Sequence, residues 1–217
     1  RLPQLLGLDA KQASIHRAVS CHLGGSSSFC ALRGDISVDT TMGFSPQSGL
    51  LHSTRCETLD AFVTLYLQKT VGFGPDELIR ILCEESGLKG LSGLSGDVRD
   101  LADAARQGDK RAQLALDVFY YQARRELGAM IATLGGIETL VFTGGIGEND
   151  PETRTDICQN FGFVGVELDP QLNEQAQGAE MRISPAGARV GVWVIPTNEE
   201  LVVAREIHTL LSSTHER

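Results

Sequence analysis

The segment TLVFTGGIGENDP, residues 139–151, predicts a strand, a glycine turn and the start of a helix in close succession. Its apolar run, residues 139–143, is typical of a strand buried in a sheet that is covered on both faces. Asn149 or Asp150 can cap the following helix and Pro151 suits its first position, so we expect a helix reaching about Asn160. Strands that lead through short turns into helices are the building units of α/β folds.

The longest periodic segment, Lys110–Leu134, predicts one long amphipathic helix. Apolar side chains recur there every three or four residues, at Leu116, Tyr120, Ala123, Leu127, Met130 and Leu134. Gly135 and Gly136 follow and supply a common helix end. Two shorter segments, Thr58–Lys69 and Asp76–Glu85, have the same periodicity, and we expect each of them to be a helix with one buried face.

Strand patterns occupy both ends of the chain. Near the start, three segments predict a β-meander: Ala18–Leu23, Ser27–Leu32 and Ile36–Thr40. Near the end, Gly162–Leu168 and Arg189–Ile195 read as further strands, and Asn198–Leu211 reads as a closing helix. This order of elements predicts the α/β fold class, with helices packed on a mixed sheet.

Composition excludes several classes of protein. The 217 residues include 19 Lys and Arg against 28 Asp and Glu, giving a net charge of −9, so no basic surface favours a nucleic-acid partner. No apolar run reaches the roughly 18 residues of a membrane span. The five cysteines are scattered without metal-ligand spacing, which favours a reducing, cytoplasmic setting. Because the chain begins with Arg1 and an apolar stretch, we expect it to be a piece of a longer protein.

Two glycine-rich segments are candidate binding sites. The first, HLGGSSS, starts at His22 and predicts a hairpin turn whose backbone N–H groups can approach a phosphate; the alternative is an ordinary hairpin loop beside a structural histidine. The second, residues 144–149, follows a buried strand, where α/β proteins bind ligands. Its spacing is neither the dinucleotide fingerprint nor a Walker loop. It suits a nucleotide, or it is a tight turn at a helix cap.

Three charged positions accompany these segments. Asp97 and Arg99 flank an expected helix start, where helix capping is the simpler interpretation. Arg55 precedes another helix and is either an ordinary surface cation or a bidentate partner for phosphate oxygens. Glu199 and Glu200 follow the last strand, where a carboxylate can hold Mg²⁺ together with phosphate oxygens or can cap a helix.

Six motifs in this order resemble the C-terminal half of the acetate kinase family and cover nearly the whole chain. They are HLGGSSS from His22, SVDTTMGFSP from Ser37, STRC from Ser53, GLSGDVRDL from Gly93, VFTGGIGEN from Val141 and VIPTNEEL from Val194. The resemblance implies a ribonuclease-H-like lobe of the superfamily that unites acetate and sugar kinases, heat-shock chaperones and actin. It implies that residues 1–217 form the C-terminal nucleotide-binding lobe, and that the family's N-terminal lobe is absent.

The resemblance also implies an activity, reversible phosphoryl transfer between ATP and acetate to give ADP and acetyl phosphate, with Mg²⁺ as the metal. By resemblance, Arg55 is the catalytic residue and Glu199 supports the metal. The remaining matched positions are implied to bind nucleotide: His22, Gly24, Gly25, Ser26, Asp97, Val98, Arg99, Gly144, Gly145, Ile146, Gly147 and Asn149. A homodimer formed through this lobe is implied as well, with the long helix as a candidate contributor.

Two departures from the family pattern bear on phosphate handling. Gly25 stands where the family usually has an asparagine, and Glu57 stands close to Arg55, where a negative charge is expected to weaken the grip of Arg55 on phosphate. Without the N-terminal lobe, one wall of the phosphoryl clamp is missing, so we expect no appreciable kinase activity from this chain alone. The alternatives are a propionate or butyrate kinase, or a non-catalytic module that binds nucleotide and dimerises.

Overall fold

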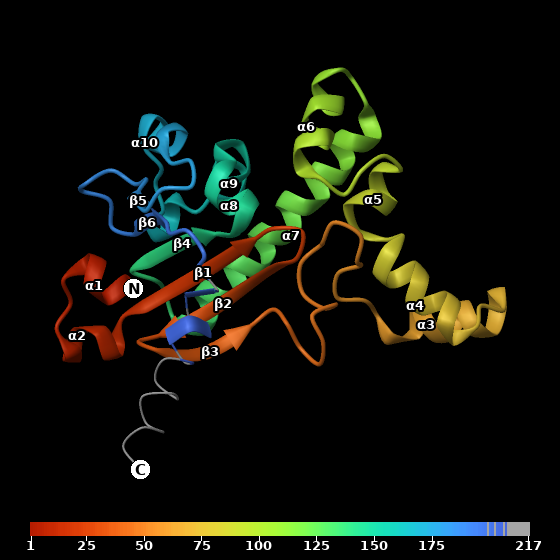
Figure 1. Ribbon diagram of the computed structural model, residues 1–217, viewed down its shortest axis with the longest axis horizontal. Coiled ribbons are helices and arrows are strands. Elements are labelled where there is room, and N and C mark those ends of the chain that lie inside the picture. The colour runs from red at the N-terminus through yellow and green to blue at the C-terminus, as the bar shows by residue number, and fades with distance from the viewer. Residues whose placement is uncertain (199, 202, 206, 208–217) are drawn as a thin grey trace, which may run out of the picture.

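The computed structural model describes residues 1–198, 200, 201, 203–205 and 207. A six-stranded mixed sheet forms its centre (Figure 1), in the order β3-β2-β1-β4-β6-β5. The strands are β1 (Arg17–Leu23), β2 (Ser27–Arg33), β3 (Ile36–Thr40), β4 (Thr139–Thr143), β5 (Met181–Arg182) and β6 (Gly191–Val194).

The sheet joins an antiparallel half to a parallel centre. β1, β2 and β3 form the predicted meander, while β1 pairs with β4, and β4 with β6, in parallel. In the parallel register His22 lies opposite Thr143, so the β1–β2 turn and the segment after β4 leave the sheet at the same edge. The mixed sheet and the buried strand at residues 139–143 are as the sequence predicted.

The long helix α7 (Lys110–Leu134) has the predicted bounds and packs against β1, β2 and β3. Asp109 caps it by accepting the backbone N–H groups of Arg111 and Ala112, and Gly135 ends it at φ 69°. Every apolar position predicted for its buried face is indeed buried. A 25-residue helix therefore anchors the core, which also contains Val19, Phe29 and Phe142.

Shorter helices surround this core (Figure 1). On the N-terminal side of α7 the structure has α1 (Leu2–Leu6), α2 (Ala10–Ile15), α3 (Ala61–Tyr66), the π-helix η1 (Leu67–Val71), α4 (Pro75–Glu84), α5 (Gly87–Ser92) and α6 (Val98–Arg106). After β4 come α8 (Gly144–Asn149), α9 (Pro151–Cys158), the 3-10 helix η2 (Gly162–Val164) and α10 (Pro170–Gln175). Helices α5 and α6 pack on α7.

Three sequence expectations about these elements are wrong. The predicted strand Gly162–Leu168 contains η2 instead, which ends at Gly165 with φ 93°, a left-handed conformation that interrupts an extended run. The glycine turn at residues 144–149 is the short helix α8. The helices predicted from Thr58 and Asp76 exist, but α3 buries no residue and α4 buries only Leu78.

The exposed faces of α3, η1 and α4 lie on an arm that extends away from the sheet (Figure 1). Periodicity identifies an apolar stripe but not what covers it, and in the described chain Phe62 remains 75% exposed. The predicted closing helix at Asn198–Leu211 falls partly outside the described residues; residues 200, 201, 203–205 and 207 are helical. No helix in the described part of the chain is long and apolar enough to cross a membrane.

Candidate functional site

A cavity of about 780 Å³ opens where three glycine-containing segments meet. These segments are the β1–β2 turn, the N-terminus of α6 and helix α8, which are far apart in the sequence. The lining residues are Gly24, Gly25, Ser53, Gly96, Asp97, Val98, Arg99, Ala102, Asp103, Arg106, Gly145, Ile146, Asn149, Asp150, Pro151, Glu152 and Glu174. The volume is within the usual range for a small-molecule site.

The first wall is the predicted hairpin turn, Gly24 to Ser26. Gly25 is exposed, and its carbonyl accepts the N–H of Ser53 at 3.2 Å, so the turn is tied to a second loop. The hydroxyl of Ser27 donates to the carbonyl of Gly24 at 3.3 Å, a hydrogen bond that spans the turn. The turn therefore keeps a defined shape while its glycines present backbone to the cavity.

His52 lies behind this turn. Its ring is 1% exposed, and its Nδ1 accepts the backbone N–H of Ser27 at 2.9 Å. Burial, with the nearby positive charge of Arg55, lowers the pKa of His52 from 6.5 to about 4. The ring is therefore neutral in the folded protein at pH 7.

We expect this histidine to make the protein acid-sensitive. The unfolded chain takes up a proton on His52 near pH 6.5, whereas the folded chain does so only near pH 4. The free energy of unfolding that the neutral ring contributes is therefore fully present above pH 6.5 and is lost as the pH falls from 6.5 to 4. The loss is on the order of 2–3 kcal/mol. Urea unfolding of the wild type and of His52→Asn at pH 7, 6, 5 and 4 measures this loss of stability, because only the wild type has a histidine at position 52 to protonate. Parallel pH curves for the two proteins would contradict the prediction.

The second wall is the N-terminus of α6. Asp97 caps the helix by accepting the backbone N–H of Arg99 at 2.9 Å, as the simpler interpretation of this motif expected. The same carboxylate also accepts Nε of Arg99 at 3.1 Å and Nη2 at 2.6 Å. Hydrogen bonding to Arg99 is the main cause that lowers the pKa of Asp97. The guanidinium of Arg99 is paired with Asp97, yet the side chain is 86% exposed, so its remaining N–H groups are available to a ligand.

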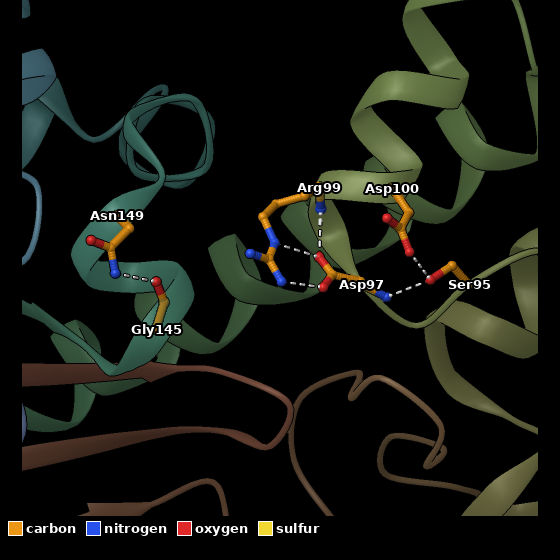
Figure 2. A network of polar contacts seen from close by, with 6 residues as sticks. All are labelled: Ser95, Asp97, Arg99, Asp100, Gly145 and Asn149. Carbon is orange, nitrogen blue, oxygen red and sulfur yellow. Dashed lines mark hydrogen bonds and ion pairs between the residues drawn. The ribbon is translucent and has the colours of Figure 1, made fainter.

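The third wall is α8, which faces the Asp97–Arg99 pair in Figure 2. Asn149 donates from Nδ2 to the carbonyl of Gly145 at 2.9 Å, one helical turn back. A Cβ added at Gly145 would meet nothing within 4 Å, so this glycine leaves open space beside the backbone. Helix backbone with open space beside it leaves room for a planar ring or a ribose.

Sequence reasoning missed Glu148, which fixes α8 to the loop after β6. Its Oε1 accepts the N–H of Gly144 at 2.8 Å and the N–H of Thr197 at 2.9 Å. The hydroxyl groups of Thr143 and Thr197 are also hydrogen-bonded to each other. One carboxylate thus joins the ends of two neighbouring strands, and nothing in the local sequence around Glu148 indicates the second partner.

Sequence reasoning also missed the outer part of the cavity, which is charged. Arg106 of α6 forms an ion pair with Asp103 at 2.6 Å and with Glu152 of α9 at 3.3 Å. Arg99, Asp103 and Arg106 recur at helical spacing, so the periodicity of α6 could have placed them on one face. The rest of the lining that was not predicted consists of Ser53, Gly96, Ala102, Asp150, Pro151 and Glu174.

The cavity brings together most of the residues predicted to bind nucleotide, but not all of them. Four of these positions are not part of its lining, His22, Ser26, Gly144 and Gly147, and neither is Arg55, the predicted catalytic residue. His22 and Gly144 lie close to each other, since a Cβ at Gly144 would be 3.1 Å from Cε1 of His22, and Gly144 precedes the lining residue Gly145. Arg55 is two residues from the lining residue Ser53, and its Nη1 donates to the carbonyl of Pro46 at 3.3 Å.

The expected weakening of the grip of Arg55 on phosphate by Glu57 stays a prediction. No ion pair joins these two side chains in the described part of the chain, and the pKa of Glu57 is raised by burial, opposed by the positive charge of Arg125. The predicted metal ligand, Glu199, lies outside the described residues. Within residues 1–198 and the other described positions, no group of three His, Cys, Asp or Glu side chains is arranged to hold a metal.

The fold is that of the acetate and propionate kinases. The crystal structure of Porphyromonas gingivalis acetate kinase aligns with a TM-score of 0.91 at 35% identity, over 97% of this chain and 52% of that one. A propionate kinase from Francisella tularensis aligns with a TM-score of 0.84 at 30% identity, over 94% of this chain and 50% of the other.

Sequence comparison gives the family. The sequence model of the acetokinase family matches residues 3–205, and the chain belongs to this family. It is 43% identical over 206 residues to the acetate kinase of Dictyoglomus turgidum, which covers 95% of this chain and 50% of that protein. The acetate kinase of Clostridium botulinum strain Hall is 40% identical over 203 residues. The chain spans about half the length of the curated relatives it matches.

Proposed function

We propose that this chain is the nucleotide-binding lobe of an acetate kinase, an enzyme that transfers a phosphoryl group reversibly between ATP and acetate. The single observation that supports this most is the cavity, because it collects Gly24, Asp97, Arg99, Gly145 and Asn149 from three distant segments. These are positions that the family motifs mark for nucleotide. The relatives are named as acetate kinases.

The three walls of the cavity would bind different parts of the nucleotide. The open backbone at Gly145, with Ile146 and Asn149, would hold adenosine. Two walls would face the phosphates. The β1–β2 turn presents backbone without a side chain at Gly25, and the N-terminus of α6 presents the positive end of its helix dipole, which favours anions. The exposed guanidinium of Arg99 would border the nucleotide between them.

Arg55 is proposed to contact the transferring phosphoryl group. Phosphoryl transfer depends on positioning and on neutralising charge at the transferring oxygens, and a planar guanidinium can do this bidentately. Ser53, two residues earlier, lines the cavity and holds the carbonyl of Gly25. A modest rotation of the Arg55 side chain away from Pro46 would free its guanidinium for substrate.

Mg²⁺ is proposed to be held by Glu199 together with nucleotide oxygens. The ion usually takes only one or two protein carboxylates, with phosphate oxygens and waters filling its other positions, so a cluster of three acidic groups is not required. When bound it would neutralise charge on the phosphate oxygens. Thr197, which is fixed by Glu148, lies two residues before Glu199 in the chain.

Propionate is a second candidate substrate. The observation that favours it is the similarity to a structure described as a propionate kinase, at 30% identity. A pocket discriminates one methylene by only about 1–3 kcal/mol, so related enzymes can differ in acyl preference through few contacts.

The homodimer remains a prediction, and it would not use the face of α7 that the sequence suggested. That face is buried inside the lobe against the sheet. The exposed apolar side chains of the described chain are instead concentrated on the arm, at Phe62, Leu65, Tyr66, Val71 and Ile79. Sedimentation equilibrium of the 217-residue protein measures the association.

Nucleotide titration of the 217-residue protein tests the proposal. We expect calorimetric binding of ADP, and we expect Gly145→Leu to weaken it at least tenfold, since the new side chain would enter open space in the cavity. Gly187→Leu is the matched control: it also meets nothing within 4 Å and lies outside the lining, so its affinity should equal that of the wild type. Equal affinity in all three proteins would exclude this cavity as the nucleotide site.

The same protein should show no appreciable acetate-dependent formation of ADP from ATP. A near-attack geometry requires groups on both sides of the phosphoryl group, and this chain is proposed to supply only one side. A coupled enzyme assay at saturating ATP and acetate measures this. Turnover at a rate typical of enzymes, about 1 per second or faster, would show that the chain is sufficient by itself.

A further inference from the structure

His52 has an arrangement that the family motifs do not account for. Its ring is buried, its Nδ1 accepts the N–H of Ser27 at 2.9 Å, and its Nε2 has no hydrogen-bond partner among the described residues. Buried polar nitrogens nearly always have partners, so an unpaired one calls for an explanation. The bond from Ser27 to Nδ1 is therefore the only hydrogen bond that the described chain makes to this ring.

The geometry fixes the state of the ring. A backbone N–H can only donate, so Nδ1 must be the unprotonated nitrogen and the ring proton must be on Nε2. A protonated ring carries a hydrogen on both nitrogens and loses the bond to Ser27. The hydrogen bond therefore exists only with the neutral Nε2–H form.

The backbone of His52 is fixed on its other side by α5. Its carbonyl accepts the N–H of Leu88 at 2.9 Å, and Gly87 lies so close that an added Cβ would be 2.3 Å from that carbonyl oxygen. The next residue, Ser53, donates its N–H to the carbonyl of Gly25. The segment 52–53 thus connects α5 to Gly25 within the Gly24–Ser26 turn and to Ser27 directly after it.

We propose that His52 is a positioning residue, whose Nδ1 holds Ser27 and thereby sets the shape of the Gly24–Ser26 turn that faces the nucleotide phosphates. The inference rests on the proposed function, because it assigns the turn to phosphates. It adds a residue outside the cavity that acts on affinity through the turn. The effect is expected at the phosphate end, because the ring is hydrogen-bonded to Ser27 and no hydrogen bond within the described chain joins His52 to α8.

Two variants and two ligands test this. His52→Asn places Oδ1 where Nδ1 stands and keeps the acceptor, whereas His52→Met keeps bulk but has no such acceptor. We expect His52→Met to weaken ADP binding about tenfold and to leave adenosine binding within about twofold of the wild type. His52→Asn should retain ADP affinity within about threefold. In the wild type, the imidazole ¹⁵N spectrum at pH 7 should show the Nε2–H tautomer for the signal that disappears in both variants.

The outcomes separate the two proposals. If the wild type binds neither ADP nor adenosine, the proposed function fails and this inference fails with it. If the wild type binds both, the inference alone is overturned by equal ADP affinity in His52→Met and wild type, or by equal losses for ADP and adenosine, which would indicate a general packing role. A ring protonated at Nδ1 would overturn it as well, even if neither variant folds.

Discussion

Gly144→Ala should destabilise the protein by roughly 2–5 kcal/mol, the sum of left-handed backbone strain and overpacking. Gly144 has φ +78°, and an added Cβ would lie 2.6 Å from the carbonyl oxygen of Leu23, a fully buried residue of β1. The two nearest atoms are the backbone carbonyl oxygen and carbon of Leu23, which cannot move aside cheaply. The junction where β1 and β4 leave the sheet would have to separate. Thermal unfolding followed by circular dichroism should show a fall in Tm of about 10 °C.

Gly145→Ala is the matched control for this prediction. The two glycines are adjacent in α8, but Gly145 has no left-handed φ and its added Cβ meets nothing. Alanine at an exposed helical position is favoured over glycine by up to about 1 kcal/mol, so this variant should be as stable as the wild type or slightly more stable. Similar Tm values for the two alanine variants would mean that the close approach of Gly144 to Leu23 carries no energetic weight.

The same glycine pair illustrates how far the sequence predicts the site. Glycines after a buried strand predicted a place where a flat ring or a ribose can lie against backbone; this stays a prediction, and Gly145 lines the cavity. They did not indicate that residues 144–149 would be helical, because that helix depends on Glu148 bonding both to Gly144 and to the distant Thr197. A hydrogen bond between segments 49 residues apart leaves no local pattern.

The fold was predictable wherever one element buries a continuous apolar face. The helix at Lys110–Leu134 and the strand at residues 139–143 have strong periodic or continuous patterns, and the structure reproduces their predicted bounds. Prediction from apolar patterns fails where the burial of a face depends on a second element of structure. The apolar stripe of residues 58–69 predicted a buried face, yet α3, which forms in this segment, buries no residue in the described chain.

The charged residues that line the cavity were unpredictable for the same reason. Arg106 and Glu152 read as ordinary surface residues in the sequence, since each is on a helix with polar neighbours. Only the packing of α6 and α9 on α7 brings them to 3.3 Å across the cavity opening. Motifs therefore located the part of the site that is built from backbone, and the part built from exposed side chains required the tertiary structure.

A second large effect is expected at Arg154, which is 0% exposed although no carboxylate forms an ion pair with it within the described chain. Its guanidinium is satisfied by backbone and amide oxygens instead. Nη1 donates to Gly147 at 2.9 Å, Nη2 to Asn173 at 2.6 Å and to Ala176 at 3.1 Å, and Nε to Oδ1 of Asn173 at 2.7 Å. One side chain thus joins α8, α9 and α10, and burial lowers its pKa.

Arg154→Met should therefore cost about 3–5 kcal/mol, because it leaves several buried oxygens without donors. Arg106→Met is the matched control: the same chemical change at an exposed ion pair should cost no more than about 1 kcal/mol. Urea denaturation at pH 7 measures both. Because Nη1 of Arg154 holds the carbonyl of Gly147 in α8, ADP affinity should also fall in Arg154→Met under conditions where it remains folded. Equal stability losses in the two variants would show that the buried guanidinium is not what joins these helices.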